Sequence, residues 1–214
     1  MPGRHILKLM AGFKRFRESY FAEENSVYGR LASSGQTPKI LVIGCSDSRV
    51  DPALLSSASP GDLFVVRNVA NLVPPFEKNS TGLHGVSSAI EFAVAILKVE
   101  TVIVLGHRQC GGIRALVVPD SGASTTFIHR WVQIAKAAKE RVLQKYPGAS
   151  EDELCKHCEK EAIISSIENL KTFPFVQSAI QERSMEVLGL YFDLEQGALW
   201  ELDEKTTQFN ALVI

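Results

Sequence analysis

Three short apolar runs rich in β-branched residues constrain the fold more than any other feature of this 214-residue sequence. They cover residues 39–44, 63–66 and 101–105, and each has the length of a strand. A segment with helical character over 80–98 separates the last two runs. Near-continuous apolar runs separated by helices are typical of a parallel sheet that is covered on both faces. The sequence therefore predicts an α/β fold with a mostly parallel sheet.

The remaining elements are expected at the two ends of the chain. Residues 5–22 carry apolar side chains at helical spacing, which predicts an amphipathic helix within an N-terminal helical arm over 1–34. Its apolar stripe could cover the chain's own core or a partner subunit. Ser150 and Glu153 have the spacing of a capping box. Helices are expected over 124–146, 150–170 and 172–183, and an antiparallel edge hairpin over 186–194 and 198–202.

Composition and charge exclude several classes of protein. Charged residues make up 22% and hydrophobic residues 45%, which is ordinary for a globular protein, and the length suits a single domain over 1–214. The net charge of −1 gives no electrostatic reason to expect a nucleic-acid partner. No apolar stretch approaches the roughly 20 residues of a membrane span, so no membrane partner is expected.

Four cysteines are too few for a scaffold built on disulfides. The N-terminus lacks the pattern of an export signal, so thiolates or metal ligands are more plausible than disulfide bridges. These features predict a cytoplasmic protein. The pair Cys155 and Cys158, on a predicted helix, is expected to be core or surface thiols, because the second half of a zinc-binding pattern is missing.

Three potential metal ligands follow two of the predicted strands. Cys45 ends the first run, while His107 and Cys110 follow the third run as H-x-x-C. Because the carboxyl ends of parallel strands meet at one edge of a sheet, the three side chains can converge there. Two thiolates and an imidazole suit zinc better than magnesium or calcium. Three protein ligands leave a fourth position for water, as in catalytic zinc sites.

Four longer motifs around these ligands resemble the β-class carbonic anhydrases. They are G-C-S-D-S-R-V-D-P at 44–52, F-V-V-R-N-V-A-N-L-V-P-P at 64–75, A-I-E-F-A-V at 89–94 and G-H-R-Q-C-G-G-I at 106–113. The resemblance implies the β-carbonic anhydrase fold and one Zn²⁺ per chain, held by Cys45, His107 and Cys110. It implies reversible hydration of CO2 to bicarbonate and a proton through a zinc-bound hydroxide. It also implies a homo-oligomer, either a dimer or a tetramer of dimer units.

The resemblance assigns catalytic roles to Asp47 and Arg49. Asp47 can complete the zinc tetrahedron in a closed state, or stand off and accept a hydrogen bond from the hydroxide, and Arg49 holds it in place. The closed-form branch of the family uses a tryptophan and a tyrosine where this sequence has Val42 and Phe192. That departure favours the open, plant-type branch, although Arg67, a third element of the closed-form pocket, is present.

Five residues fall where the family binds substrate. Gln36 would hydrogen-bond a substrate oxygen, Phe64, Val69 and Phe92 would line an apolar CO2 pocket, and Gly111 would complete it. Without the resemblance, Gln36 would be taken for a polar loop residue and the three apolar residues for core. Phe92 also departs from the tyrosine often found at its position, which puts any role of that hydroxyl in proton transfer in doubt.

Two other functions are compatible with the same scaffold. Relatives of this family hydrolyse CS2 or carbonyl sulfide, but the intact Gln36, Asp47 and Arg49 favour CO2. A catalytically silent, zinc-stabilised binding protein would be expected to have lost a ligand or the Asp47–Arg49 pair, and neither is lost. Because two thiolates cancel the formal charge of Zn²⁺, its water should be less acidic than in a three-histidine site, which predicts activity that rises into mildly alkaline pH.

Overall fold

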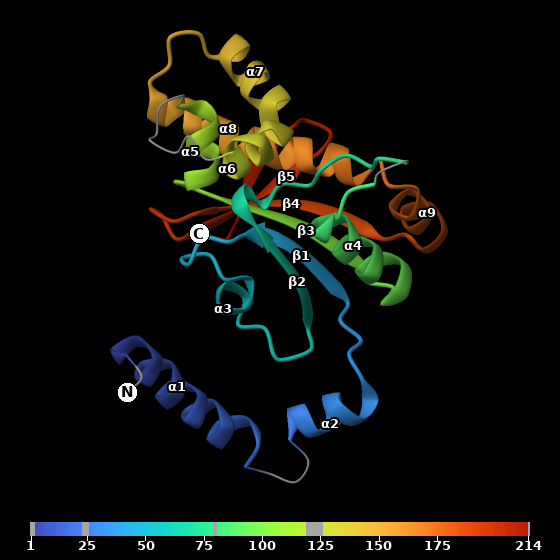
Figure 1. Ribbon diagram of the computed structural model, residues 1–214. Coiled ribbons are helices and arrows are strands. Elements are labelled where there is room, and N and C mark those ends of the chain that lie inside the picture. Colours follow the sequence, from blue (N-terminus) through green and yellow to red (C-terminus); the bar gives the residue numbers. More distant parts are fainter. Residues whose placement is uncertain (1–2, 23–25, 79–80, 119–125, 214) are drawn as a thin grey trace.

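The computed structural model describes residues 3–22, 26–78, 81–118 and 126–213, and within these ranges six strands form one sheet (Figure 1). The strands are β1 (Ile40–Cys45), β2 (Leu63–Asn68), β3 (Thr101–His107), β4 (Glu186–Asp193), β5 (Ala198–Asp203) and β6 (Gln208–Val213). Their order is β2-β1-β3-β4-β5-β6; the first four are parallel, and β5 and β6 run antiparallel. The predicted α/β fold, with a mostly parallel sheet and an antiparallel edge, is confirmed.

One strand was not predicted from the sequence. β6 pairs with β5 and forms the edge of the sheet, so the predicted 198–202 strand is not the last one. In β6 the ring of Phe209 contacts Tyr191 of β4, with ring centroids 6.1 Å apart. The apolar residues Phe209, Ala211 and Val213 of β6 alternate, so a short period-2 signal was present, and the apolar Leu212 between them, which is exposed, weakens it.

The helices after the fourth motif follow the prediction with one break. The predicted helix over 124–146 is described from residue 126, as α6 (Thr126–Val132), a 3₁₀ turn η3 (Gln133–Ala135) and α7 (Lys136–Lys145), while 124–125 lie outside the described residues. Ser150 and Glu153 form the predicted capping box at the start of the next helix. That helix is α8 (Glu151–Leu170), and α9 (Pro174–Arg183) follows it.

The helices before the fourth motif are shorter than expected. Residue 80 lies outside the described residues, and the predicted helix over 80–98 is α4 (Gly85–Glu91), continued by a π-helical turn η2 (Phe92–Ile96). Short elements that the sequence pattern did not resolve are α3 (Pro52–Ser56), a 3₁₀ turn η1 (Val69–Asn71) and α5 (Gly111–Val117).

No helix of the described ranges combines the length and the hydropathy needed to cross a membrane.

The two faces of the sheet are covered differently. Side chains such as Leu41, Ile43 and Val102 pack in a buried core with residues of α4, η2 and α9, and α8 lies along β3 and β4 on the same side. On the other face an open apolar groove of about 330 Å³ runs over β1, β3 and β4, with Val42 and Phe192 among its lining residues and α3 at its rim. The expectation that both faces are covered is therefore wrong for this face within one chain.

The N-terminal arm does not fill that groove. It consists of α1 (Arg4–Tyr20) and α2 (Val27–Ser34), and Figure 1 shows both helices apart from the sheet, beyond α3. Every described residue of α1 is exposed or half-buried, including Leu7, Met10 and Phe13. The apolar stripe of the first helix therefore does not cover the core of its own chain.

Candidate metal centre

The strand order places a functional site at the carboxyl ends of β1 and β3. The second strand in the sequence, β2, pairs with one edge of β1, and the third strand, β3, pairs with the opposite edge. The order of the strands across the sheet therefore reverses direction between β1 and β3. Ligand sites of open α/β sheets form at such a point. Cys45 is the last residue of β1, His107 is the last residue of β3, and Cys110 is the N-cap of α5.

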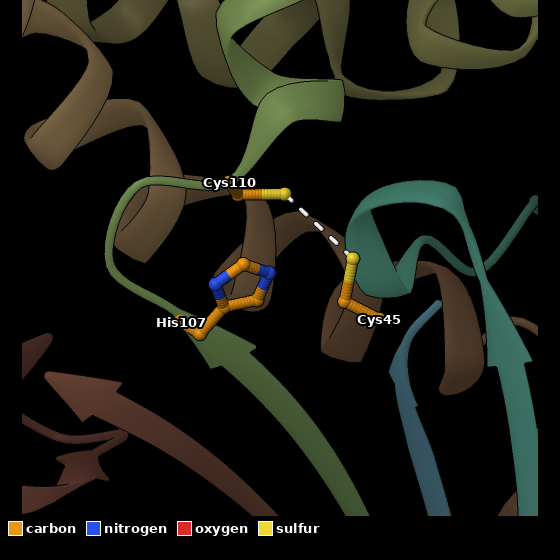
Figure 2. Close-up of side chains that lie close together, drawn as sticks. All are labelled: Cys45, His107 and Cys110. Carbon is orange, nitrogen blue, oxygen red and sulfur yellow. Dashed lines mark hydrogen bonds between the residues drawn. The ribbon is translucent and has the colours of Figure 1, made fainter. Parts of the chain in front are cut away.

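These three side chains form one buried cluster. Figure 2 shows them pointing toward one another, and their ligand atoms all lie within 4.8 Å of each other. The Cys45 and Cys110 sulfurs are 3.9 Å apart, much farther than the roughly 2 Å of a disulfide. Two thiolates on one tetrahedral zinc, at about 2.3 Å each, would lie roughly 3.8 Å apart. The cluster fits zinc, and it is the one such group in the described part of the chain.

His107 is held in the tautomer that a metal ligand needs. Its Nδ1 lies 2.8 Å from the carbonyl oxygen of Arg108, so Nδ1–H donates to that oxygen and Nε2 keeps its lone pair. Nε2 is buried, and within the described structure it has no hydrogen-bond partner. Because buried polar atoms are rarely left unpaired, this nitrogen fits the role of a metal ligand.

The two thiols interact strongly in the absence of a metal. A hydrogen bond from Cys110 lowers the pKa of Cys45. The same contact, together with burial, raises the pKa of Cys110. The pair therefore shares one proton, and a bound Zn²⁺ would replace that proton because a coordinating thiol is deprotonated.

Asp47 and Arg49 form a rigid pair beside the cluster. The Asp47 amide donates to the Cys45 sulfur at 3.4 Å, while its carboxylate accepts from Arg49 Nε at 2.9 Å and from Nη2 at 2.8 Å. These hydrogen bonds hold the pKa of Asp47 well below its usual range. Arg49 also donates to the carbonyl oxygen of Gln109 at 3.1 Å. One guanidinium thus links the loop after β1 to the loop that carries His107 and Cys110.

Arg67 has a structural role in the described contacts. Its guanidinium donates to the carbonyl oxygens of Cys45, at 2.9 Å, and Asp47, at 2.6 Å, and it pairs with Asp51 at 2.8 Å. Arg67 therefore fixes the turn that presents the first ligand. Val42 and Phe192, at the other two closed-form positions, lie in the apolar groove.

The predicted substrate pocket is divided within one chain. Val69 lies close to Gly112, so Val69 and Gly111 are both near the Cys110 loop. Phe64 stacks on Phe92, with ring centroids 5.8 Å apart, and Phe64 packs against a different core cluster from the one that contains Cys45 and Cys110. Gln36 is exposed in the segment between α2 and β1.

Sequence reasoning missed two side chains that hold the ligand loop. Gln109, between the two ligands, bridges Arg49 and Glu195. Glu159 of α8 accepts a hydrogen bond from the Cys110 amide. A signal for Glu159 was present, because it stands at helical spacing from Cys155 (i−4), within the apolar stripe of its helix.

The other two cysteines take no part in the cluster. Cys155 and Cys158 are buried and free, as expected for core thiols. Burial raises the pKa of both, that of Cys158 to about 12.

Comparisons with known proteins agree with this geometry. The carbonic anhydrase family model matches residues 40–199. Beta carbonic anhydrase 3 of Arabidopsis thaliana is 39% identical over 212 residues, which cover 97% of this chain and 81% of that protein. The β-carbonic anhydrase CcaA has a TM-score of 0.90 at 32% identity, covering 98% of this chain and 92% of that chain.

Two fungal enzymes extend the similarity. CafA of Aspergillus fumigatus has a TM-score of 0.82 at 30% identity, covering 93% of this chain and 91% of its own. A tetrameric β-carbonic anhydrase from Sordaria macrospora has a TM-score of 0.78 at 30% identity, covering 92% and 95%. With the family model matched over most of the sheet and a Cys-His-Cys cluster that fits zinc, the chain belongs to the β-class carbonic anhydrases, zinc lyases that hydrate CO2 reversibly to bicarbonate.

Proposed function

We propose that Cys45, His107 and Cys110 are the zinc ligands of this anhydrase and that Asp47 and Arg49 are its catalytic pair. The observation that carries the proposal is the convergence of three ligand atoms within 4.8 Å, beside a carboxylate held by a guanidinium. Zinc, when bound, acidifies water and supplies the nucleophile that CO2 hydration needs.

Asp47 acts as the acceptor that orients the reacting water. Three hydrogen bonds from Arg49, two from its guanidinium and one from its amide at 3.0 Å, hold the carboxylate in one position. The low pKa of Asp47 keeps it ionised at neutral pH, so it accepts rather than donates. A carboxylate engaged in this way stands off the metal, which supports the open form rather than a closed one.

Replacement of Asp47 by asparagine tests this role. Asp47→Asn keeps the size of the side chain but removes the charge, and we expect kcat to fall by roughly 10²- to 10⁴-fold. Zinc content should stay near one per chain, because Asp47 is not a ligand in the open form. Loss of zinc from Asp47→Asn to the same extent as from Cys110→Ser would instead make Asp47 a ligand and contradict the proposal.

A homodimer is the assembly that the exposed surfaces favour. Apolar residues of α1, including Leu7, Met10 and Phe13, are 52–63% exposed, and the sheet carries an open apolar groove. The amphipathic helix and the apolar groove do not contact each other within one chain. In a dimer, the apolar face of the helix of one copy can pack in the groove of the other. We therefore place the arm of one copy, within the predicted 1–34 segment, on the groove of the other.

The same dimer accounts for the divided substrate pocket. If Gln36, Phe64 and Phe92 line a CO2 pocket, a second copy must supply them to the metal cluster, because one chain keeps them apart from it. Co-expression of Gln36→Ala with Asp47→Asn tests this arrangement. Exchange of copies would create about a quarter of the sites with both residues intact, and activity should recover to that level. No recovery above either single variant would place Gln36 in its own chain's site.

A direct test of the dimer is deletion of residues 1–22. Light scattering after gel filtration should show a dimer or a tetramer for the full chain and a smaller species for the truncated chain. An unchanged mass after truncation would contradict the role of the arm.

We propose a cytoplasmic location on the evidence of the thiols. All four cysteines are free, and two of them, Cys155 and Cys158, lie on one helix without forming a bridge, which suits a reducing compartment. Fractionation of cells that express the tagged chain would test this, and recovery of the protein in an oxidising compartment would contradict it.

A further inference from the structure

A buried carboxylate lies directly behind the metal centre, outside the catalytic pair. Glu159 projects from the middle of α8 and is 2% exposed. A buried carboxylate is unfavourable unless it is paired and hydrogen-bonded, so the groups that contact Glu159 indicate its role.

Glu159 accepts two hydrogen bonds and faces one guanidinium in the described structure. Its Oε1 accepts from the Cys110 backbone amide at 3.1 Å, and its Oε2 accepts from the Tyr191 hydroxyl at 2.8 Å. The guanidinium of Arg108, which also donates to Asp152 at 2.6 Å, lies 3.8 Å from Oε1. These contacts hold both carboxylate oxygens of Glu159 in place.

The amide that Glu159 holds belongs to a residue that the proposed function makes a ligand. The same loop is held on its other side by Arg49, through the carbonyl oxygen of Gln109. Arg108 continues the connection, because its carbonyl oxygen accepts the Nδ1–H of His107 and its guanidinium faces Glu159. Glu159 thus ties the segment that carries two of the three ligands to the longest described helix of the protein.

We propose that Glu159 is a positioning residue for zinc: it fixes the backbone of Cys110, and with it the direction of the Cys110 sulfur, through one hydrogen bond that Tyr191 and Arg108 hold in place. This inference rests on the proposed ligand role of Cys110. The metal centre would then include, beyond its three ligands, a buried Glu159–Tyr191 pair that holds one ligand in place. Replacing residues that hold a metal ligand in this way typically weakens metal binding by roughly 10- to 100-fold.

Glu159→Gln is the informative substitution, since it keeps the size of the side chain. The oxygen at the Oε1 position can still accept from the Cys110 amide, but it faces the Arg108 guanidinium without a negative charge. The NH₂ group at the Oε2 position meets the Tyr191 hydroxyl, which must turn from donor to acceptor. Glu161→Gln is the matched control. It makes the same change in charge on the same helix, two residues away, where Glu161 pairs with Arg141 near the surface.

Zinc affinity, measured by competition with a chromophoric chelator, is the main readout. We expect Glu159→Gln to weaken zinc binding by about 10- to 100-fold and Glu161→Gln to leave it within about twofold. Tyr191→Phe removes a single donor from Glu159, and we expect it to weaken zinc binding by about fivefold, the effect of one ordinary hydrogen bond. Cobalt-substituted protein gives a second readout: the sulfur-to-cobalt absorption should change in Glu159→Gln and stay unchanged in Glu161→Gln.

The outcomes separate this inference from the proposed function. Failure of the wild-type chain to bind about one zinc would refute the ligand assignment itself. Normal zinc binding by wild type, together with unchanged affinity and an unchanged cobalt spectrum in folded Glu159→Gln, would overturn the role of Glu159 alone. Should Glu159→Gln not fold, Tyr191→Phe decides, and wild-type zinc affinity in that variant would overturn the inference.

Discussion

The contact between β3 and α8 leaves no room for a side chain at Gly106, the residue before the ligand His107. A methyl group on Gly106 would lie 2.6 Å from Cδ1 and 2.8 Å from Cγ1 of Ile163, and 3.5 Å from Nδ2 of Asn71. Favourable carbon–carbon contacts are about 3.5–4.0 Å, so the two nearest atoms would overlap. Ile163 is fully buried and Asn71 almost so, which leaves neither residue free to move into solvent.

We therefore expect Gly106→Ala to destabilise the protein by about 1–3 kcal/mol, the usual cost of overpacking a core. In a chain of this length each kcal/mol lowers Tm by roughly 2–4 °C, so Tm should fall by about 2–12 °C. The strain also displaces the end of β3. Because small displacements of catalytic groups are costly, kcat/KM for CO2 should fall by about 10- to 100-fold.

Thermal unfolding followed by circular dichroism, with stopped-flow CO2 hydration on the same samples, measures both effects. Gly85→Ala is the control, since a methyl group there meets no atom within 4 Å. Ile163→Val removes Cδ1, the nearest atom, and should partly rescue Gly106→Ala with a coupling energy of at least about 0.5 kcal/mol. Wild-type Tm and activity in Gly106→Ala, or strictly additive effects in the double variant, would refute this account of the packing.

Three further predictions concern the site and the helix caps. Arg49→Lys should lower kcat by about tenfold or more across pH 6.5 to 9 without changing zinc content, because a lysine cannot hold Asp47 by two parallel hydrogen bonds; wild-type activity would contradict this. After chelation of zinc at pH 6, mass spectrometry should find Cys45 alkylated faster than Cys158, since the hydrogen bond from Cys110 lowers the pKa of Cys45 and burial raises the pKa of Cys158 to about 12; equal rates would contradict the electrostatics. Ser150→Ala should remove the capping box of α8 and lower Tm by roughly 2–4 °C in thermal denaturation, and an unchanged Tm would show that this cap is dispensable.

The metal cluster could be predicted from the sequence because its position depends on short-range patterns alone. The apolar runs identify β1 and β3, and in a parallel sheet their carboxyl ends meet, so Cys45 and His107 lie close together and Cys110, three residues after His107, stays within reach of both. The Asp47–Arg49 pair is similarly local, since both residues lie in one turn. In each case the chemistry is carried by residues close to a strand end.

Features that depend on packing between distant segments could not be predicted. The apolar groove and helix α1 are exposed in a single chain. The periodicity of apolar residues predicts that a face is apolar, but it does not show whether the same chain or another copy covers that face. In the proposed dimer, the positions of Gln36 and Phe92 relative to the metal cluster would depend on the second copy. Glu159 was overlooked because a glutamate on a helix is usually solvated. Its place in the apolar stripe of α8 indicated burial, but only the fold shows that it lies against the Cys110 amide.

Stopped-flow CO2 hydration by metal-quantified protein from pH 6.5 to 9, with Cys110→Ser measured beside wild type, tests whether this chain hydrates CO2 at a zinc held by its thiolates. We expect about one zinc per chain and fast hydration that rises with pH in wild type, and the loss of both zinc and activity in Cys110→Ser. Bound zinc with no hydration at any pH in that range would contradict this expectation, and so would full activity in Cys110→Ser.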